Sequence, residues 1–281
     1  MLLADPEAIK TWQKQLCLDL DLKGRILVSD EGINGTVAGT PQHIDSYMAK
    51  TTANPAFADL EWKVSWADEQ VFPKLKVVVR DEIVTLGVKK QGQDVSLENK
   101  AHYIEPEELL KLYENNEDFV ILDARNLYEA EVGTFKGAIT PPIDNFREFP
   151  EFAKKLANYK DKNVVTFCTG GVRCEKASAY LREQGFKKVR QLHGGVHEYG
   201  EKVGGKYFEG ELFVFDKRLH VQVNTVNPTT LTTCLHCHTK ITRYIDCAVI
   251  SCPSLFSCCE VCQEKYLGAC SDVCKTKVAT A

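Results

Sequence analysis

The chain has 281 residues, of which 44% are hydrophobic and 26% charged, and its formal net charge is −4. This length accommodates two compact domains and a small additional module. No apolar run approaches the roughly 20 residues that cross a bilayer, and Pro6, Glu7 and Lys10 interrupt the start where a signal peptide would need apolar residues. We therefore expect a cytoplasmic protein without a membrane partner. The balance of charge does not by itself predict a nucleic-acid binder.

The first hundred residues predict a small α+β domain, the N-terminal domain (1–100). Asp5 followed by Pro6 is typical of a helix start. The expected elements, in order, are a helix to about residue 22, strands at 25–29 and 36–38, a helix at 40–50, and strands at 60–66 and 75–80. This order matches a ferredoxin-like, or acylphosphatase-like, domain that lacks its first strand. Because that strand is central in such a sheet, its loss would split the sheet, and we expect the native chain to begin upstream of Met1.

Residues 81–104 connect this domain to a central domain (101–215), with an exposed turn at 92–94. In the central domain, strands alternate with helices, which predicts a mostly parallel, doubly wound α/β sheet covered on both faces. The expected strands are 119–123, 163–167 and 188–192, and the expected helices are 105–115, 147–159 and 174–184. Sites in such sheets lie at the carboxyl ends of the strands.

Cys168 directly follows one of these strands and precedes a helix. The loop between them consists of Thr169, Gly170, Gly171 and Val172. A turn of this kind aims backbone N–H groups and the positive end of the helix dipole at one point, which favours a thiolate. Arg173 adds a fixed cation. We interpret Cys168 as a nucleophile; the alternative is a small cysteine buried in an α/β sheet without a chemical role.

The loop resembles the active-site loop of the rhodanese family, whose sulfurtransferases carry a persulfide on such a cysteine. Its ring is one residue tighter than the phosphate cradle of cysteine phosphatases and suits a single sulfur or a small electrophile. Residues 123–125, Glu129, 133–139 and 193–195 also match rhodanese patterns. Asp123 and Arg125, at the end of a strand, are expected to form an ion pair that fixes a loop, either supporting the site or serving only the structure.

Nine of the twelve cysteines lie in the last part of the chain, the cysteine-rich tail (216–281). Eight of them form four pairs with two to four intervening residues: Cys234 and Cys237, Cys247 and Cys252, Cys259 and Cys262, and Cys270 and Cys274. Eight thiolates suffice for two tetrahedral structural zinc sites. Cys258 is left over, and His236 or His238 could substitute as ligands. Free redox-active thiols or an iron–sulfur cluster are the alternatives, and spacing does not reveal which pairs share a metal.

Three long segments together, 24–39, 146–150 and 167–181, resemble the rhodanese-domain tRNA uridine-34 hydroxylase family, and the resemblance covers nearly the whole chain. It implies oxygen-dependent 5-hydroxylation of the wobble uridine, with molecular oxygen as co-substrate, Cys168 as the essential cysteine, the tRNA anticodon loop as partner, and neither DNA nor a membrane. The first strand of the family's N-terminal domain is missing here. The sequence has no flavin fingerprint or haem motif, so we expect neither cofactor.

Two versions of the chemistry remain open at this stage. Cys168 could add as a thiolate to C6 of uracil, with loop amides and Arg173 stabilising the negative charge, or it could carry a persulfide. Lys23, Arg25, the 30–35 loop, Phe146 and Arg147 could flank a base, although solvated surface is the simpler reading of each. The competing functions are a sulfurtransferase that uses Cys168 without RNA and, third, a non-enzymatic rhodanese-like adaptor.

Overall fold

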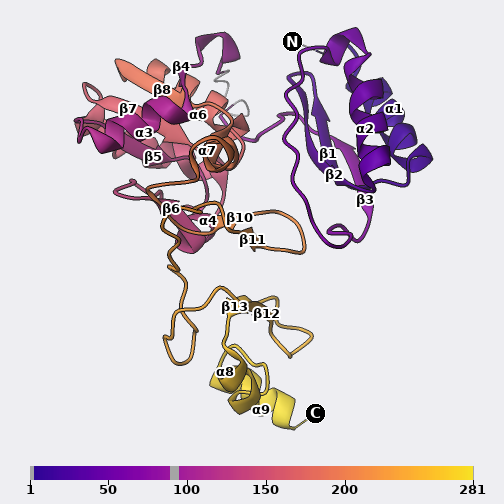
Figure 1. The fold of residues 1–281 in the computed structure, drawn as a ribbon, viewed down its shortest axis with the longest axis vertical. Helices are drawn as coiled ribbons and strands as arrows, with labels where there is room; N and C mark the ends of the chain where they lie inside the picture. Colours follow the sequence, from indigo (N-terminus) through magenta and orange to yellow (C-terminus); the bar gives the residue numbers. More distant parts are fainter. Residues whose placement is uncertain (1–2, 89–94, 281) are drawn as a thin grey trace.

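The computed structural model describes residues 3–88 and 95–280 of the chain. Figure 1 shows the N-terminal domain beside the central domain and the cysteine-rich tail below them. The turn expected at 92–94 lies outside the described residues. Among those described, no helix is both long and apolar enough to cross a membrane.

The N-terminal domain packs two helices against one face of a three-stranded sheet (Figure 1). Its elements are α1 (Pro6–Asp19), β1 (Lys23–Ser29), β2 (Gly32–Ala38), α2 (Pro41–Thr52) and β3 (Leu75–Val79). The Asp5 carboxylate accepts a hydrogen bond from the Ala8 N–H at 2.9 Å and caps α1 as expected. Leu16, Cys17, Ile26 and Val28 are buried in the core between the helices and the sheet.

The expectation that this sheet would be split is wrong. β1 is the central strand, antiparallel to β2 and parallel to β3, and the sheet is continuous. β1 can take the centre because its ladder groups pair on both sides and its alternate side chains, Ile26 and Val28, are buried.

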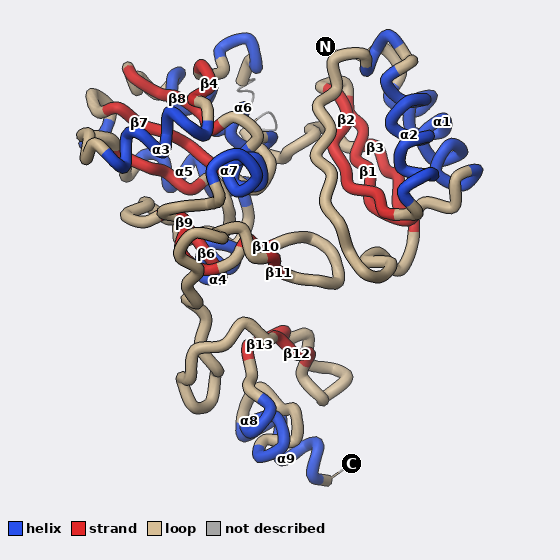
Figure 2. Tube along the Cα trace, in the orientation of Figure 1, coloured by secondary structure: helices blue, strands red, loops and turns tan. Residues whose placement is uncertain are grey.

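The strand expected at 60–66 is not formed either. Instead, this segment runs between the sheet and the central domain (Figure 2). Trp62 donates its indole N–H to the Thr52 hydroxyl at 3.1 Å. Glu61 pairs with His193 of the central domain, and the carbonyl of Trp66 accepts from Arg218, just beyond that domain. The polar groups of this segment therefore have partners outside any sheet. The alternation of apolar and polar residues in its sequence could not reveal this.

The central domain has the expected parallel sheet, in the order β4-β8-β7-β5. Buried side chains cover both faces. Its strands are β4 (His102–Ile104), β5 (Val120–Asp123), β6 (Gly133–Phe135), β7 (Asn163–Phe167), β8 (Lys188–Leu192), β9 (Phe208–Gly210) and β10 (Leu212–Phe213), and β11 (His220–Val221) pairs with β10 from beyond residue 215. Its helices are α3 (Pro106–Glu114), α4 (Leu127–Val132), α5 (Phe149–Lys154), α6 (Val172–Glu183) and α7 (Gly195–Val203).

The helix expected at 147–159 is shorter than predicted. Only α5 is α-helical there, flanked by 3-10 turns at Phe146–Glu148 and Ala157–Tyr159. Phe146 is buried, with its ring centroid 5.5 Å from that of Phe149, so it belongs to the core rather than to the surface or a base pocket. Packing of these aromatic rings thus determines the conformation of this segment.

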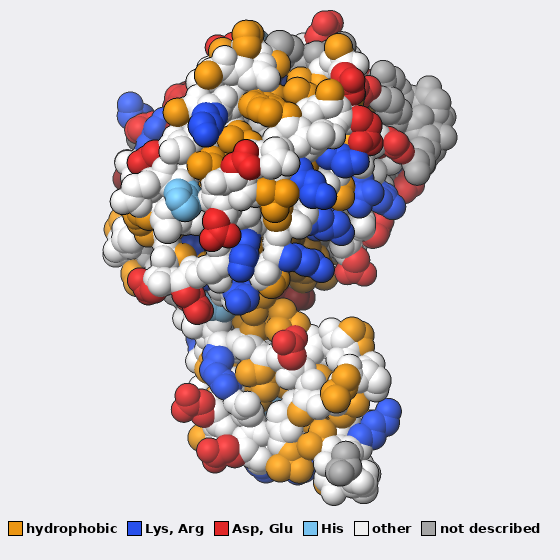
Figure 3. Space-filling model, turned by 90° about the vertical axis from the view of Figure 1, so that its right-hand side faces the viewer, with side chains coloured by type: hydrophobic (Ala, Val, Ile, Leu, Met, Phe, Trp, Pro, Cys, Tyr) orange, Lys and Arg blue, Asp and Glu red, His pale blue; other side chains and the backbone are white. Residues whose placement is uncertain are grey.

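The cysteine-rich tail is mostly loop (Figure 2). It contains β12 (Tyr244–Asp246) and β13 (Leu255–Ser257), which form a hairpin, followed by α8 (Glu260–Lys265) and α9 (Asp272–Ala279). Its small core consists mainly of cysteines, with Phe256 and Ala269. Figure 3 shows acidic, basic and hydrophobic side chains intermixed on the N-terminal face, and hydrophobic side chains among charged ones on the tail below. Large apolar side chains are thus few in the core of the tail.

A buried ion-pair cluster joins the N-terminal and central domains. Lys176 on α6 lies 2.7 Å from a Glu31 carboxylate oxygen and 2.8 Å from one of Glu82. The Glu82 carboxylate also accepts the N–H groups of Leu86 and Gly87. Burial would raise the pKa of Glu82, but its bonds to Lys176 and to these amides lower it. The helix that follows the Cys168 loop is therefore tied directly to the N-terminal domain.

Candidate active site and metal centres

Cys168 lies at the carboxyl end of β7, in the loop that leads into α6. Its Sγ accepts a hydrogen bond from the Gly171 N–H at 3.1 Å, so the sulfur faces the ring of loop amides. Gly171 has φ +97°, a left-handed conformation that glycine adopts without strain. The residue is only 2% exposed. Geometry of this kind stabilises a thiolate.

The turn at 193–195 supports this loop from behind. The Val196 N–H donates to the Cys168 carbonyl at 2.9 Å and the His197 N–H to the Thr169 carbonyl at 3.1 Å. A Cβ atom at Gly195 would lie 2.5 Å from the Cys168 carbonyl oxygen, so only glycine permits this contact. The start of α7 thus fixes the backbone that carries the sulfur.

The electrostatics of the loop favour an ionised Cys168. Burial by itself would raise its pKa, but a hydrogen bond from the Cys174 thiol, the charge of Arg173 and the N–H groups of Cys174 and Gly171 outweigh it and lower the pKa to about 6. The pKa of the Cys174 thiol is raised well above its usual value by burial and by the neighbouring Cys168, so Cys174 remains a neutral hydrogen-bond donor. A thiolate is therefore available at neutral pH.

Arg173 is held by a carboxylate that the sequence reasoning did not single out as a site residue. Its guanidinium donates to the two Glu129 oxygens at 2.5 and 2.7 Å and to the Thr169 hydroxyl at 3.2 Å. Glu129 is fully buried. Arg173 thus acts on Cys168 through its charge while the bidentate pair fixes its position.

Asp123 and Arg125 form the expected ion pair. The Arg125 Nη2 lies 2.6 Å from an Asp123 oxygen, and both side chains are fully buried. Arg125 also donates to the Gly133 carbonyl at 2.6 Å, and its guanidinium lies 5.4 Å from the Phe167 ring. The pair links the end of β5 to the start of β6, which agrees with a loop-fixing role.

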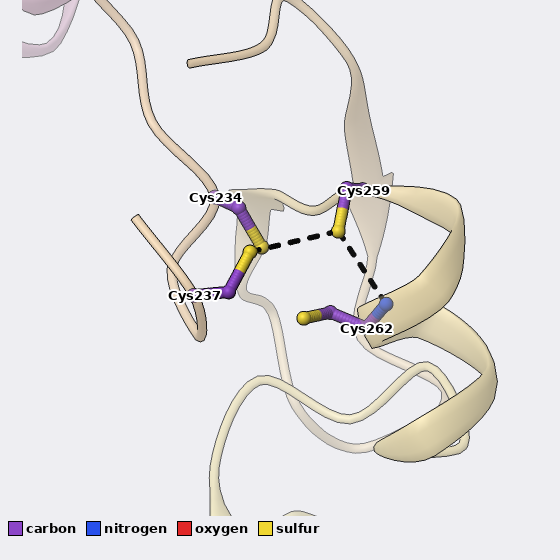
Figure 4. Close-up of side chains that lie close together, drawn as sticks. All are labelled: Cys234, Cys237, Cys259 and Cys262. Carbon is purple, nitrogen blue, oxygen red and sulfur yellow. Dashed lines mark hydrogen bonds between the residues drawn. The ribbon is translucent and has the colours of Figure 1, made fainter. Parts of the chain in front are cut away.

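The tail brings its eight paired cysteines into two groups. Cys234, Cys237, Cys259 and Cys262 form one group, and Cys247, Cys252, Cys270 and Cys274 form the other; within each, the sulfur atoms lie within 4.8 Å of one another. Figure 4 shows the first group converging from two loops and the start of α8, with Cys259 accepting the Cys262 N–H at 3.4 Å. Both groups could hold a metal ion, and four converging thiolates suit tetrahedral zinc.

The first cysteine pair joins the third and the second joins the fourth, a crossing that spacing left open. Cys258 stands outside both groups: its thiol donates to the Cys259 carbonyl at 3.4 Å, and burial raises its pKa to about 11. His236 stacks on Tyr266, with centroids 3.8 Å apart, and is not needed as a ligand. His238 is likewise outside both groups.

Sequence reasoning also missed several residues around the Cys168 loop. Lys63 of the N-terminal domain lies over Gly170, where a Cβ atom would be 3.9 Å from its side chain. Lys176 joins the domains from the helix after the loop. Cys174 lies within the Cys168 loop motif, so the sequence could have indicated its role. Nothing in the sequence around Lys63 indicates that this residue lies beside the loop.

Comparisons with known proteins agree with this arrangement. A family model described as "UPF0176 acylphosphatase like domain" matches residues 1–83, "Rhodanese-like domain" matches 105–202, and "Rhodanase C-terminal" matches 209–275. A solved rhodanese-like domain from Anabaena sp is 24% identical, covers 38% of this chain and 78% of its own, and has a TM-score of 0.33. The family models define the class: a rhodanese-like protein with an acylphosphatase-like N-terminal domain, as predicted.

Curated relatives extend the match over almost the whole chain. A protein from Cytophaga hutchinsonii is 44% identical over 97% of this chain and 86% of its own length, and one from Listeria welshimeri is 42% identical over 98% and 86%. One from Staphylococcus epidermidis is 42% identical over 96% and 84%. All three are named tRNA uridine(34) hydroxylase. The chain belongs to the tRNA uridine(34) hydroxylase family, which confirms the resemblance noted in its sequence.

Proposed function

We propose that this protein hydroxylates the wobble uridine of tRNA at C5, with molecular oxygen as co-substrate and the anticodon loop as its binding partner. The observation that carries the proposal is the Cys168 sulfur facing a ring of amide donors, in a chain whose relatives are named for this activity. A tRNA substrate would place the protein in the cytoplasm.

In the proposed reaction, the Cys168 thiolate adds to C6 of uracil, which makes C5 electron-rich and open to attack on molecular oxygen. One oxygen atom stays on C5, and the other leaves as water with two electrons and two protons from an external two-electron reductant. Loss of the C5 proton then expels the Cys168 thiolate from C6 and restores the C5–C6 double bond. Negative charge that develops on the base is stabilised by the loop amides of Thr169 to Val172 and by the nearby charge of Arg173. Persulfide chemistry on Cys168 would use the same ring. Asp123 and Arg125 support the loop through β5 and β6.

We further propose that the chain is divided into three domains at 1–100, 101–215 and 216–281, and that the tail holds two structural zinc ions. The supporting observation is the pair of four-cysteine groups. Zinc at these positions would neutralise thiolate charge and hold the loops that carry them. Neither group includes Cys168, so the zinc would be structural.

The direct test is nucleoside mass spectrometry of tRNA from a strain that lacks this gene and is complemented with variants. Wild type and Cys17→Ser should restore 5-hydroxyuridine and its 5-oxyuridine derivatives, whereas Cys168→Ser should lose them. Cys17 is a matched control because it is also buried but lies in the N-terminal core. Full retention with Cys168→Ser would contradict the proposal. Unchanged 5-oxyuridine derivatives in the deletion strain, together with lost thiosulfate activity, would instead indicate a sulfurtransferase.

A further inference from the structure

Two segments from different parts of the chain lie against the Cys168 loop: residues 61–66 of the N-terminal domain and residues 213–218, which run from the end of the central domain into the start of the tail. They are joined to each other, because Arg218 Nη1 donates to the Trp66 carbonyl at 3.2 Å and the Lys217 N–H to the Val71 carbonyl at 3.1 Å. Figure 1 shows the loop between β10 and β11 reaching toward the N-terminal domain. We call these two segments together the rim.

The first segment of the rim crosses directly over the loop. Glu61 lies 3.1 Å from the His193 ring, at the turn that supports Cys168. Two residues on, Lys63 approaches Gly170. Within 4 Å its ammonium has only Glu61, at 3.9 Å, as a carboxylate partner among the described residues. Lys63 therefore brings a weakly paired cation to the edge of the Cys168 loop.

The second segment places an aromatic ring against the Arg173 guanidinium. The centroid of the Phe215 ring lies 5.9 Å from the Arg173 Cζ, and Arg173 is itself fixed by Glu129. The charge of Arg218, in contrast, is paired with Asp216 at 2.6 Å, so Arg218 serves to join the two segments. The Phe215 ring is therefore held in place by its contact with Arg173.

Trp66 and Phe215 are the two most exposed aromatic side chains among the described residues, at 78% and 62%. Single exposed apolar side chains are ordinary. Here, however, both lie in the rim, beside a weakly paired lysine. Exposed rings next to a cation are the elements with which proteins bind single-stranded RNA, by stacking on bases and neutralising phosphate. A small-molecule substrate would need neither exposed aromatic rings nor a neighbouring cation.

We propose that the rim is the RNA-binding site of this protein: Trp66 and Phe215 stack on unpaired bases of the anticodon loop, and Lys63 binds a phosphate beside the base that reaches Cys168. The inference rests on the proposed function, because it takes RNA as the substrate. It assigns contacts that lie outside the cysteine loop and come from both domains. A docked protein would instead use the rings as apolar anchors, with no response to single-stranded bases.

The test measures binding of a fluorescently labelled anticodon stem-loop RNA to the zinc-loaded full-length protein by anisotropy. Trp66→Ala and Phe215→Ala should each weaken binding about tenfold, because each removes one base-stacking partner. Trp66→Phe and Phe215→Tyr keep a ring and should stay within about twofold. Ile250→Ala, an exposed residue of the tail, should bind as wild type. Lys63→Gln should reduce the salt slope of log K by about one, and Lys63→Arg should preserve it.

Equal binding by the alanine and ring-preserving variants would overturn the inference, as would failure of the wild type to bind the stem-loop. Should the alanine variants unfold, Phe215→Leu provides a second test, because it keeps apolar volume but removes the ring. The proposed function fails separately, through the Cys168→Ser nucleoside assay. If that assay succeeds while Trp66→Ala and Phe215→Ala bind RNA and form 5-hydroxyuridine like wild type, only the rim is refuted.

Discussion

Cys17 and Cys168 are both almost fully buried, yet their environments have opposite effects on the thiol pKa. Burial raises the pKa of Cys17 to about 12. Burial acts in the same direction on Cys168, but the Cys174 thiol, the Arg173 charge and two backbone N–H groups reverse it. The difference is made by directed hydrogen-bond donors, not by exposure. One thiol is therefore inert and the other is poised for chemistry.

The buried pair of Asp123 and Arg125 gives a prediction at the same scale. Asp123→Asn leaves the Arg125 guanidinium buried without its countercharge, and we expect a loss of about 3–5 kcal/mol in the free energy of unfolding. Urea denaturation measures this change. Asp118→Asn is the matched control, because Asp118 pairs with Lys162 at 2.8 Å on the surface, where such a pair contributes about 0–1 kcal/mol. Equal, small losses for the two variants would show that the buried pair does not fix the loop.

At the scale of elements, the crossing of the cysteine pairs makes the tail one unit. The β12–β13 hairpin lies between cysteines of both groups, since Cys247 and Cys252 lie in its turn and Cys259 follows its second strand. A loop released at one group thus disturbs the other. The two groups are expected to fill and to empty together.

Removal of one ligand tests this directly. Cys247→Ser should lower bound zinc from two ions per chain toward none and should expose the tail to protease, because the two groups empty together and each structural zinc contributes about 10 kcal/mol or more to folding in such small modules. Elemental analysis with native mass spectrometry gives the stoichiometry. Cys258→Ser, outside both groups, should retain two ions. A full zinc content in Cys247→Ser, or its loss in Cys258→Ser, would contradict the assignment.

The sequence identified those parts of the site that are local in the chain. The strand, the glycine-containing loop and the helix around Cys168 follow from adjacent residues, and the metal-capable cysteines follow from their pair spacing. The sharing of cysteines between groups did not follow, because spacing says nothing about how loops cross. Lys176 and Glu31, which are 145 positions apart, meet only through the docking of two domains. The 60–66 segment was misread as a strand for the same reason.

At the scale of the whole molecule, the N-terminal domain completes the surroundings of a site whose nucleophile lies in the central domain. Lys176 fixes the two domains to each other through Glu31 and Glu82. Lys63 then lies beside Gly170 of the loop. Arg218, just beyond the central domain, bonds to the Trp66 carbonyl of the segment that carries Lys63. RNA would thus meet a surface built by two domains around one sulfur atom.

The proposed chemistry requires Cys168 to be a thiolate in the intact protein at neutral pH. The most direct measurement is the pH dependence of iodoacetamide alkylation at Cys168, followed by peptide mass spectrometry on the zinc-loaded protein. Because the folded-state pKa is lowered, the reactive form is present above the midpoint and is lost as the pH falls through it. The account predicts a midpoint near the pKa of about 6. A midpoint between 8 and 9, as for an ordinary free thiol, would contradict it.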